Sequence, residues 1–190
     1  EISSIDKNIA LNISRLLRSG GLDNYRKFLN CLNYLVVDEK LIPDDFLNIT
    51  FYADPYLHDW KNESGEKIGI ISYKSLFLAN EIEVNEKLNL QLRKCGLSPK
   101  TFFISTLKDH IIQKKLIEIF KKEDIKLIIT TTSFSSSQIK NNDLIENSTN
   151  IFTSLKIPIL QLLSSNRSRK KWLNSSIGMN SSDLLMQIII

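Results

Sequence analysis

The segment KIGIISYK, residues 67–74, decides how the rest of the chain is interpreted. It has the length of a β-strand and is apolar on both faces, so neither face is suited to water. Three later segments share this character, namely TFFISTL at 101–107, IKLIITTT at 125–132 and IPILQLLS at 157–164. Strands that are buried on both faces are typical of a parallel sheet covered by helices.

The intervals between these strands have helical periodicity. Residues 79–95 carry apolar side chains at helical spacing and end near Gly96 and Pro99. The segment 111–120 repeats the same pattern, and a further helix is expected at about 143–155. The sequence therefore predicts an α/β fold in which helices cover a parallel sheet, with flavodoxin-like or Rossmann-like layering.

The beginning of the chain has a different pattern. Apolar residues recur at helical spacing on both sides of Gly20 and Gly21, which predicts a helical pair. We expect residues 1–41 to be the end of a preceding domain and residues 42–66 to be a linker with a short strand at ITFYA, 49–53. The α/β domain then covers 67–190, and its apolar last residues lead us to expect that it is truncated at the C-terminal end.

Composition excludes several classes of protein. The 25 lysines and arginines are interspersed with 21 acidic residues, and no aromatic residues interleave with a basic stripe, so no nucleic-acid partner is predicted. No window approaches the ~18 apolar residues of a membrane span. Cys31 and Cys95 lie far apart, which excludes a CxxC site and fits a reducing compartment. We therefore expect a cytoplasmic protein.

Motifs for catalysis are absent from the sequence. No GxGxxG or GxxxxGK follows a strand, so no nucleotide cofactor is predicted. His58 and His110 lack the spaced partners of a metal site, and there is no GxSxG nucleophile elbow. The residues alone indicate an α/β binding or scaffolding domain without a recognisable catalytic centre.

A binding site in such a sheet is expected at the carboxyl ends of the strands, where the strand-to-helix loops emerge. All four of these loops are polar, and three carry a lysine or an arginine. The candidate contact residues on or beside them are Tyr73, Lys74, Lys108, Asp109, Phe134, Gln161, Arg169 and Trp172.

Each candidate also has a structural explanation, since polar loops are normal in any α/β domain. Asp109 is suited to a helix start, and Phe134 and Trp172 are suited to core packing. Gln161 interrupts an apolar strand; if buried, it needs hydrogen-bond partners and is expected to orient the loop with Tyr73 or Thr132.

The order of the short motifs resembles the large subunits of aerobic cobaltochelatase and magnesium chelatase. The motifs are GIISYK, GLSP, STLKD, TTTSF, IPILQ and SRKKWLNSSIGMNSSDLLMQI, and Gly20-Gly21 with Asn24 resembles the family's Gly-Gly-x-x-Asn segment. The family's closing block, Ser-Arg-x-x-Trp-x-x-Ser-x-Gly-Leu-x-x-x-Asp, is matched without a gap by Ser168, Arg169, Trp172, Ser175, Gly178, Met179 and Asp183. The chain is therefore similar to an internal fragment of such a subunit.

Some residues depart from the family pattern. Lys74 stands in place of an arginine, which keeps the charge but loses the planar bidentate fork. Asn166 stands in place of a glycine, and Met179 in place of a leucine. Ser-Thr-Leu-Lys-Asp and Pro-Ile-Leu-Gln favour the cobalt branch, whereas Trp-Leu-Asn-Ser resembles the magnesium branch at least as well.

The resemblance implies a metal chelatase of the ligase class. Its large subunit would bind the tetrapyrrole and the metal, while AAA+ type partner subunits hydrolyse ATP. The reaction would insert Co²⁺ into hydrogenobyrinic acid a,c-diamide in cobalamin biosynthesis, and the full complex would use ATP, Mg²⁺ and Co²⁺. The alternatives are insertion of Mg²⁺ into protoporphyrin IX, or a non-catalytic structural or small-molecule-binding domain.

The resemblance also implies what this fragment would do. It is expected to bind no cofactor, to hold no metal and to be inactive alone, and its catalytic residues are unknown. Lys74, Lys108 and Arg169 would pair with carboxylates of the tetrapyrrole, and Tyr73, Phe134 and Trp172 would supply flat apolar surface. The same residues would otherwise contact other domains of the subunit.

Overall fold

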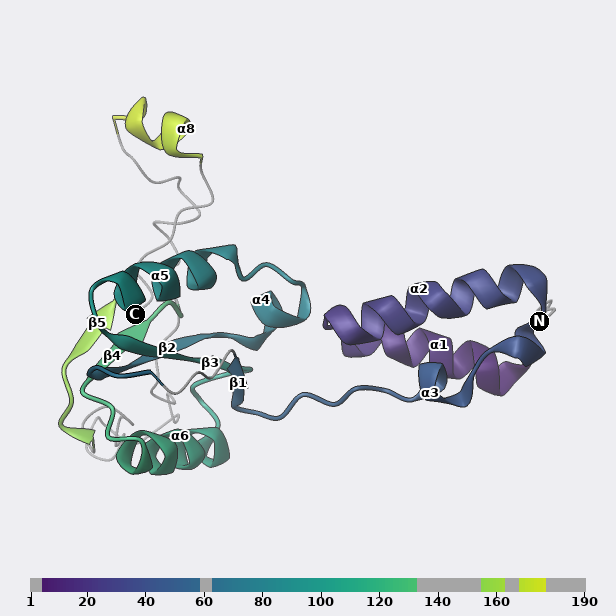
Figure 1. Cartoon of the computed structure of the whole chain (residues 1–190), viewed down its shortest axis with the longest axis horizontal. Coiled ribbons are helices and arrows are strands. Elements are labelled where there is room, and N and C mark those ends of the chain that lie inside the picture. The colour runs from purple at the N-terminus through teal and green to yellow at the C-terminus, as the bar shows by residue number, and fades with distance from the viewer. Residues whose placement is uncertain (1–4, 59–62, 133–154, 163–167, 177–190) are drawn as a thin grey trace, which may run out of the picture. The chain divides into compact units, whose positions relative to one another are not determined.

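The structure is a computed structural model that describes residues 5–58, 63–132, 155–162 and 168–176 (Figure 1). The chain divides into two compact units. Unit 1 comprises Glu1–Ala53 and Ser75–Glu83, and unit 2 comprises Asp54–Lys74 and Val84–Ile190. The polypeptide therefore leaves unit 2 after Lys74 and returns to it at Val84. The domain boundaries expected from the sequence stay a prediction.

Unit 2 contains a five-stranded sheet in the order β1-β3-β2-β4-β5. Its strands are β1 (Tyr56–His58), β2 (Lys67–Tyr73), β3 (Ser98–Ile104), β4 (Leu127–Thr130) and β5 (Ile159–Gln161). The last four are mutually parallel, as the apolar segments predict, and β1 runs antiparallel to β3 at one edge. The sequence therefore predicts the parallel part of the sheet correctly and misses this edge strand.

Two of the predicted strands are displaced. Residues 49–53 form no strand, and the edge strand follows at Tyr56, too short and too evenly half-buried to show an alternating pattern. The strand expected at 101–107 begins at Ser98 and ends at Ile104. Pro99 was expected to mark the end of the preceding helix, but it lies inside β3. It precedes Thr101–Phe103, the stretch that pairs with β1, so the sheet tolerates its missing N–H.

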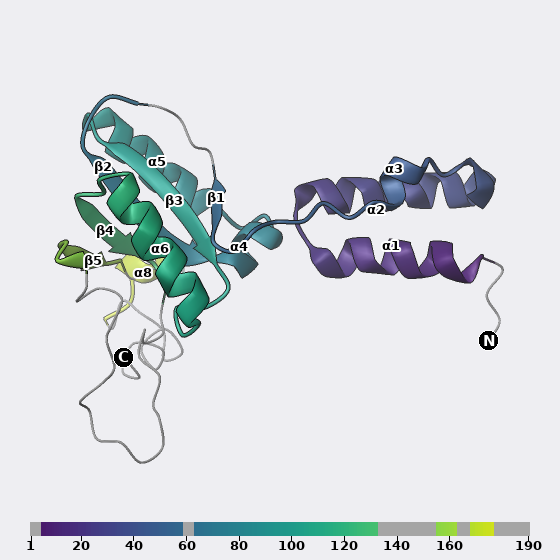
Figure 2. The same ribbon diagram turned by 90° about the horizontal axis from the view of Figure 1, so that it is seen from below.

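Two helices cover opposite faces of the sheet, α5 (Glu83–Lys94) and α6 (His110–Lys122) (Figures 1 and 2). Under α6, Phe102 and Phe120 pack edge to face with ring centroids 5.1 Å apart. Leu88 and Leu92 of α5 pack on the opposite face against a cluster containing Ile70. This layering is the α/β architecture that the sequence predicts.

The helix expected at 79–95 begins four residues later than expected, at Glu83, and ends at Lys94. A short helix, α4 (Lys74–Leu78), follows β2 directly, and Asn80 then adopts a positive φ of 61° before α5 begins. The predicted helix at 111–120 is confirmed as α6. The helix expected at about 143–155 lies outside the described residues, except for its last residue.

Unit 1 is built on the predicted helical pair, α1 (Lys7–Ser19) and α2 (Leu22–Val37). A single 3-10 turn, η1 (Glu39–Leu41), and α3 (Asp44–Leu47) follow. The buried apolar core consists of Ile13, Leu16, Cys31 and Ile42. Tyr34 and Phe46 pack beside it, with ring centroids 6.0 Å apart.

The turn between α1 and α2 requires two glycines. Gly20 and Gly21 have φ values of 65° and 86°, where a side chain is strained. A Cβ on Gly21 would lie 2.4 Å from Cε2 of Tyr52, and one on Gly20 would lie 3.0 Å from Cβ of Leu78. The Gly21 amide also donates to the Leu78 carbonyl at 2.8 Å. The turn therefore brings two later segments of unit 1 close to the backbone.

Asn24 completes this turn. Its side chain is fully buried, and its Nδ2 donates to the carbonyls of Gly20 at 2.8 Å and Thr50 at 2.9 Å. Its Oδ1 accepts the Thr50 amide at 2.8 Å. The Gly-Gly-x-x-Asn segment thus holds the α1–α2 turn and the segment around Thr50 together.

Charged side chains gather at the amino edge of the sheet. Lys67 pairs with Glu123 at 3.0 Å, and Arg93 pairs with Glu63 at 2.8 Å. Lys100 in β3 is only 2% exposed. Burial lowers the pKa of Lys100, and the negative charge of Glu63 opposes that shift.

Candidate functional site

The order of the strands marks one position at the carboxyl edge. The chain passes from β2 to β3 on one side, and then from β3 across to β4 on the other side of β2. The strand order therefore reverses between β2 and β4, and the helices that follow β2 and β3 lie on opposite faces (Figure 2). Open α/β sheets bind their ligands outside the carboxyl ends of strands at such a switch point.

Hydroxyl groups connect β2 and β4 at this position. Oγ1 of Thr131, just after β4, lies 2.9 Å from Oγ of Ser72 and 3.2 Å from the carbonyl of Ile71. The Thr131 amide donates to the same Ile71 carbonyl at 2.9 Å. Ser72 is fully buried, and its Oγ approaches Oδ1 of Asn85 at 3.5 Å. The carboxyl edge thus carries a neutral polar cluster of Ser72, Asn85 and Thr131.

Asn85 is the unusual member of this cluster. Its side chain is 4% exposed, and its Nδ2 has no hydrogen-bond partner among the described residues. Asn89, one helical turn later, is equally buried but exchanges hydrogen bonds of 3.0 and 3.1 Å with Thr101. A buried donor without a partner costs about 1–3 kcal/mol. Of these two buried asparagines of α5, the one with the unsatisfied donor therefore lies beside the switch point.

Gln161 extends the polar edge toward β5. Its Nε2 donates to the Thr132 carbonyl at 3.4 Å, the segment that the sequence predicted it to orient. Oγ1 of Thr132 in turn lies 2.8 Å from Oγ1 of Thr130. Gln161 is exposed, and β5 lies at the edge of the sheet formed by the described strands.

Four candidates lie on the loops that leave β2 and β3. Tyr73 ends β2 opposite Ile104 in β3, and Lys74 begins α4; both side chains are half-buried. Lys108 is exposed, and Asp109 is the N-cap of α6, accepting the Ile111 amide at 2.7 Å. The helix-start explanation of Asp109 is therefore confirmed. Because β2 and β3 are neighbours, the structure brings these two loops to the same edge.

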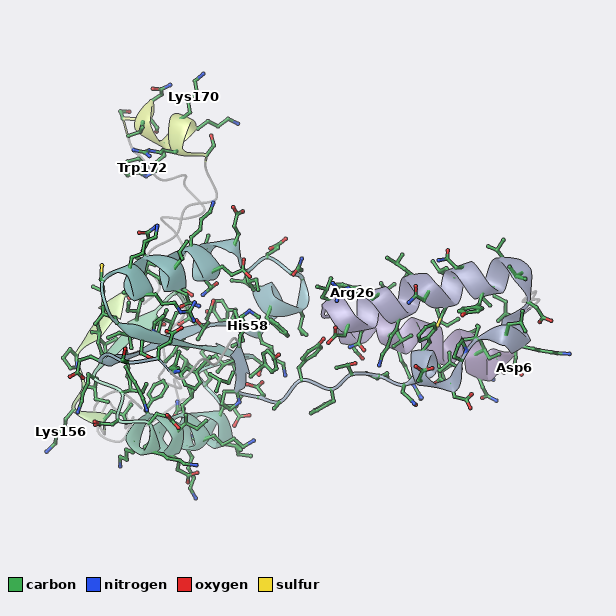
Figure 3. The ribbon with its side chains drawn as sticks, viewed as in Figure 1. Asp6, Arg26, His58, Lys156, Lys170 and Trp172 are labelled. Carbon is green, nitrogen blue, oxygen red and sulfur yellow. The ribbon has the colours of Figure 1, made fainter. Side chains whose placement is uncertain are left out.

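The remaining candidates lie farther along the chain. Arg169 and Trp172 belong to α8 (Arg169–Leu173), whose N-cap Ser168 accepts the Lys171 amide at 3.4 Å. Trp172 projects from this helix, and it is 46% exposed, so core packing does not describe it (Figure 3). Phe134 lies outside the described residues. Phe134 follows β4 in sequence, and Arg169 and Trp172 follow β5.

Sequence analysis missed Asn85, although the pattern of α5 contains a signal for it. Asn85 and Asn89 are four residues apart and share the helical phase of Leu88 and Leu92, which pack on the sheet. Polar residues within an apolar helical stripe are buried and need partners.

Other kinds of site are not seen in the described part of the chain. Within it, no group of three or more histidine, cysteine, aspartate or glutamate side chains is placed to hold a metal ion. No helix there is long and apolar enough to cross a membrane. The geometry therefore indicates a neutral hydrogen-bonding edge flanked by lysines.

Comparison with known proteins gives a consistent family. The model of the family described as CobN/Magnesium Chelatase matches residues 14–190. The aerobic cobaltochelatase subunit CobN of Pseudomonas aeruginosa is 23% identical over 184 residues, covering 92% of this chain and 14% of that protein. The uncharacterized protein MJ0908 of Methanocaldococcus jannaschii is 28% identical over 207 residues, covering 96% of this chain and 17% of that protein.

A solved structure agrees with the fold. The catalytic subunit of cobaltochelatase from Mycobacterium tuberculosis superposes with a TM-score of 0.74 at 19% identity, covering 98% of this chain and 16% of that one. The chain therefore spans only 14–17% of the length of these relatives.

Proposed function

The chain belongs to the CobN/magnesium chelatase family, and we propose that it is part of the large subunit of an ATP-dependent cobaltochelatase. The reaction proposed for the complete enzyme is insertion of Co²⁺ into hydrogenobyrinic acid a,c-diamide, a ligase-class step of cobalamin biosynthesis. Support for cobalt comes from the name of the Pseudomonas relative and from the STLKD and PILQ segments. Magnesium chelation of protoporphyrin IX is the alternative within the same family.

In the complete enzyme, AAA+ type partner subunits are proposed to hydrolyse ATP, with Mg²⁺ as its counter-ion. This sequence contains no GxxxxGK loop, which agrees with the proposal. Co²⁺ enters as substrate, and no catalytic residue is assigned to this chain. The chain alone is proposed to be inactive and to contribute binding surface to the tetrapyrrole.

The observation that carries this proposal is the buried Nδ2 of Asn85 at the switch point, which has no hydrogen-bond partner among the described residues. Binding sites retain polar groups that folding alone does not satisfy, and an acceptor atom of a ligand would complete this one. Ser72 and Thr131 add hydroxyls beside it. Lys74 and Lys108, on the neighbouring loops, supply positive charge for peripheral carboxylates.

The proposal is tested by titrating the 190-residue chain with hydrogenobyrinic acid a,c-diamide and following tryptophan fluorescence. In a Trp60→Phe background, Trp172 is the sole reporter, because the sequence contains two tryptophans. Saturable quenching is expected, weakened about tenfold by Lys108→Ala or Arg169→Ala, the loss of one charge-assisted contact. Lys114→Ala, an exposed lysine on α6, is the matched control and leaves the affinity unchanged.

Two results would count against this function. A folded chain that shows no quenching would assign these loops to contacts with other parts of the subunit. Equal weakening by Lys108→Ala and Lys114→Ala would show attraction by overall positive charge rather than by a defined edge.

A further inference from the structure

Helix α2 carries an apolar stripe that the described residues of unit 1 leave largely exposed, with Tyr25 half-buried. The stripe consists of Leu22, Tyr25, Leu29, Leu32 and Val36. Its four aliphatic members are exposed by 41%, 58%, 39% and 87%, in chain order. Single exposed apolar residues are ordinary, but a continuous row along one helix marks an interaction surface.

One further face of α2 packs within unit 1, and the polar positions Arg26, Asn30 and Asn33 of the helix are exposed. Cys31, Phe28 and Leu35 belong to the core formed with α1. Asn24 bonds the segment around Thr50, and Tyr34 packs on Phe46 of α3. The stripe therefore lies beside this core as a second apolar face, rather than as part of the first.

The spacing of the stripe specifies the shape of the partner. Its residues are separated by three, four, three and four positions, which is the a/d pattern of a helix–helix seam. From Leu22 to Val36 the seam extends roughly 21 Å at 1.5 Å per residue. A helix with its own apolar a/d stripe fits such a surface, whereas a flat sheet or a small ligand does not.

We propose that this stripe docks an amphipathic helix supplied by another part of the same large-subunit polypeptide. The curated relatives matched over most of this chain are six to seven times as long as the matched segment, which covers 17% and 14% of them. They therefore have ample chain to supply such a helix. This inference is independent of tetrapyrrole binding and of the metal used.

The length of the seam favours a tethered partner over a second copy of the chain. The stripe covers two heptads, whereas a self-sustaining coiled coil takes about three to four. A tether supplies an effective concentration on the order of millimolar, which makes a short seam sufficient. A free second copy at micromolar concentration lacks that advantage.

The test compares hydrogen exchange of the α2 amides in the 190-residue chain and in the complete large subunit. Exchange is expected to be slower in the complete subunit by about tenfold or more, because docking suppresses local opening. The double variant Leu29→Glu/Val36→Glu should remove this difference. Leu11→Glu, a 45% exposed position on α1, is the matched control and should preserve it.

Three results would overturn the proposal. One is equal exchange of α2 in the two proteins, and another is slowing that survives the double variant. The third is dimerisation of the 190-residue chain in sedimentation at micromolar concentration that the double variant abolishes, since a second copy would then be the partner. None of these experiments uses a tetrapyrrole. A negative result for helix docking can therefore be told apart from a negative result in the tetrapyrrole titration.

Discussion

The two units of this chain are held together in different ways. In unit 2 the strands are apolar on both faces, and two helices bury continuous clusters against them. In unit 1 four buried apolar residues form the core, and much of the order comes from hydrogen bonds to the backbone at the Gly20–Asn24 turn. One chain thus combines a unit stabilised by apolar layers with a unit stabilised by a hydrogen-bonded turn.

The largest effect is expected from Phe120→Ala in unit 2. Phe120 is fully buried and packs on Phe102, so the cavity should lower the free energy of unfolding by about 3–5 kcal/mol. Hydrogen exchange should show the loss in the sheet and α6, with the α1 and α2 amides unchanged. Equal losses in both units would show that they unfold together and would break the comparison.

Gly21→Ala tests unit 1 in the same way. Gly21 has a positive φ, and the new Cβ would overlap the Tyr52 ring. The free energy of unfolding of unit 1, measured by thermal unfolding, should therefore fall by about 2–4 kcal/mol. Gly96→Ala is the matched control in unit 2, with a φ of 76° and nothing within 4 Å of its added Cβ. It should cost only about 1 kcal/mol. Equal losses of stability in Gly21→Ala and Gly96→Ala would contradict the close approach of Tyr52 to Gly21.

Asn24→Ala should lower the free energy of unfolding by about 2 kcal/mol, because it leaves the half-buried Thr50 amide without its partner. Denaturant unfolding followed by circular dichroism measures this loss. Asn24→Asp keeps the acceptor for the Thr50 amide but removes the donors to the Gly20 and Thr50 carbonyls. If Asn24→Ala left the free energy of unfolding unchanged, the apolar core alone would account for the stability of unit 1.

A smaller, pH-dependent effect is expected at Lys100 in unit 2. Its pKa is lowered in the folded chain, so the unfolded chain binds more protons between that lowered pKa and about 10.4. The free energy of unfolding should therefore rise with pH across this window. Lys100→Met removes this contribution, so urea unfolding of the variant should lack the rise. An identical pH dependence in both proteins would contradict the shift.

The sequence predicts the parallel strands because each strand is a continuous apolar run, which is a local property of the sequence. KIGIISYK places Ile68, Ile70 and Ile71 at buried positions, and β2 forms within that segment. The edge strand Tyr56–His58 was missed because its pairing with β3 is a tertiary contact that leaves no periodic pattern in three residues. The short helix α4 was missed because its five residues are too few to show helical periodicity.

The sequence predicts only part of the candidate site, because only part of it depends on local patterns. The rule for parallel sheets located the carboxyl edge, and Tyr73, Lys74, Lys108 and Asp109 lie there. Asn85 was missed because its missing partner is visible only once α5 is packed on the sheet. A pattern predicts that a residue is buried, whereas the number of its hydrogen bonds depends on three-dimensional distances.

Asn85→Leu gives the most direct test that the switch point is a binding edge. Leucine has a similar size and removes the unpaired donor, so the free energy of unfolding should rise by about 1 kcal/mol. Tetrapyrrole affinity in the fluorescence titration should fall about tenfold, corresponding to one lost hydrogen bond. Asn89→Leu, whose partner Thr101 would lose its bonds, should destabilise the chain without a direct effect on affinity. A more stable Asn85→Leu chain with unchanged affinity would contradict the account.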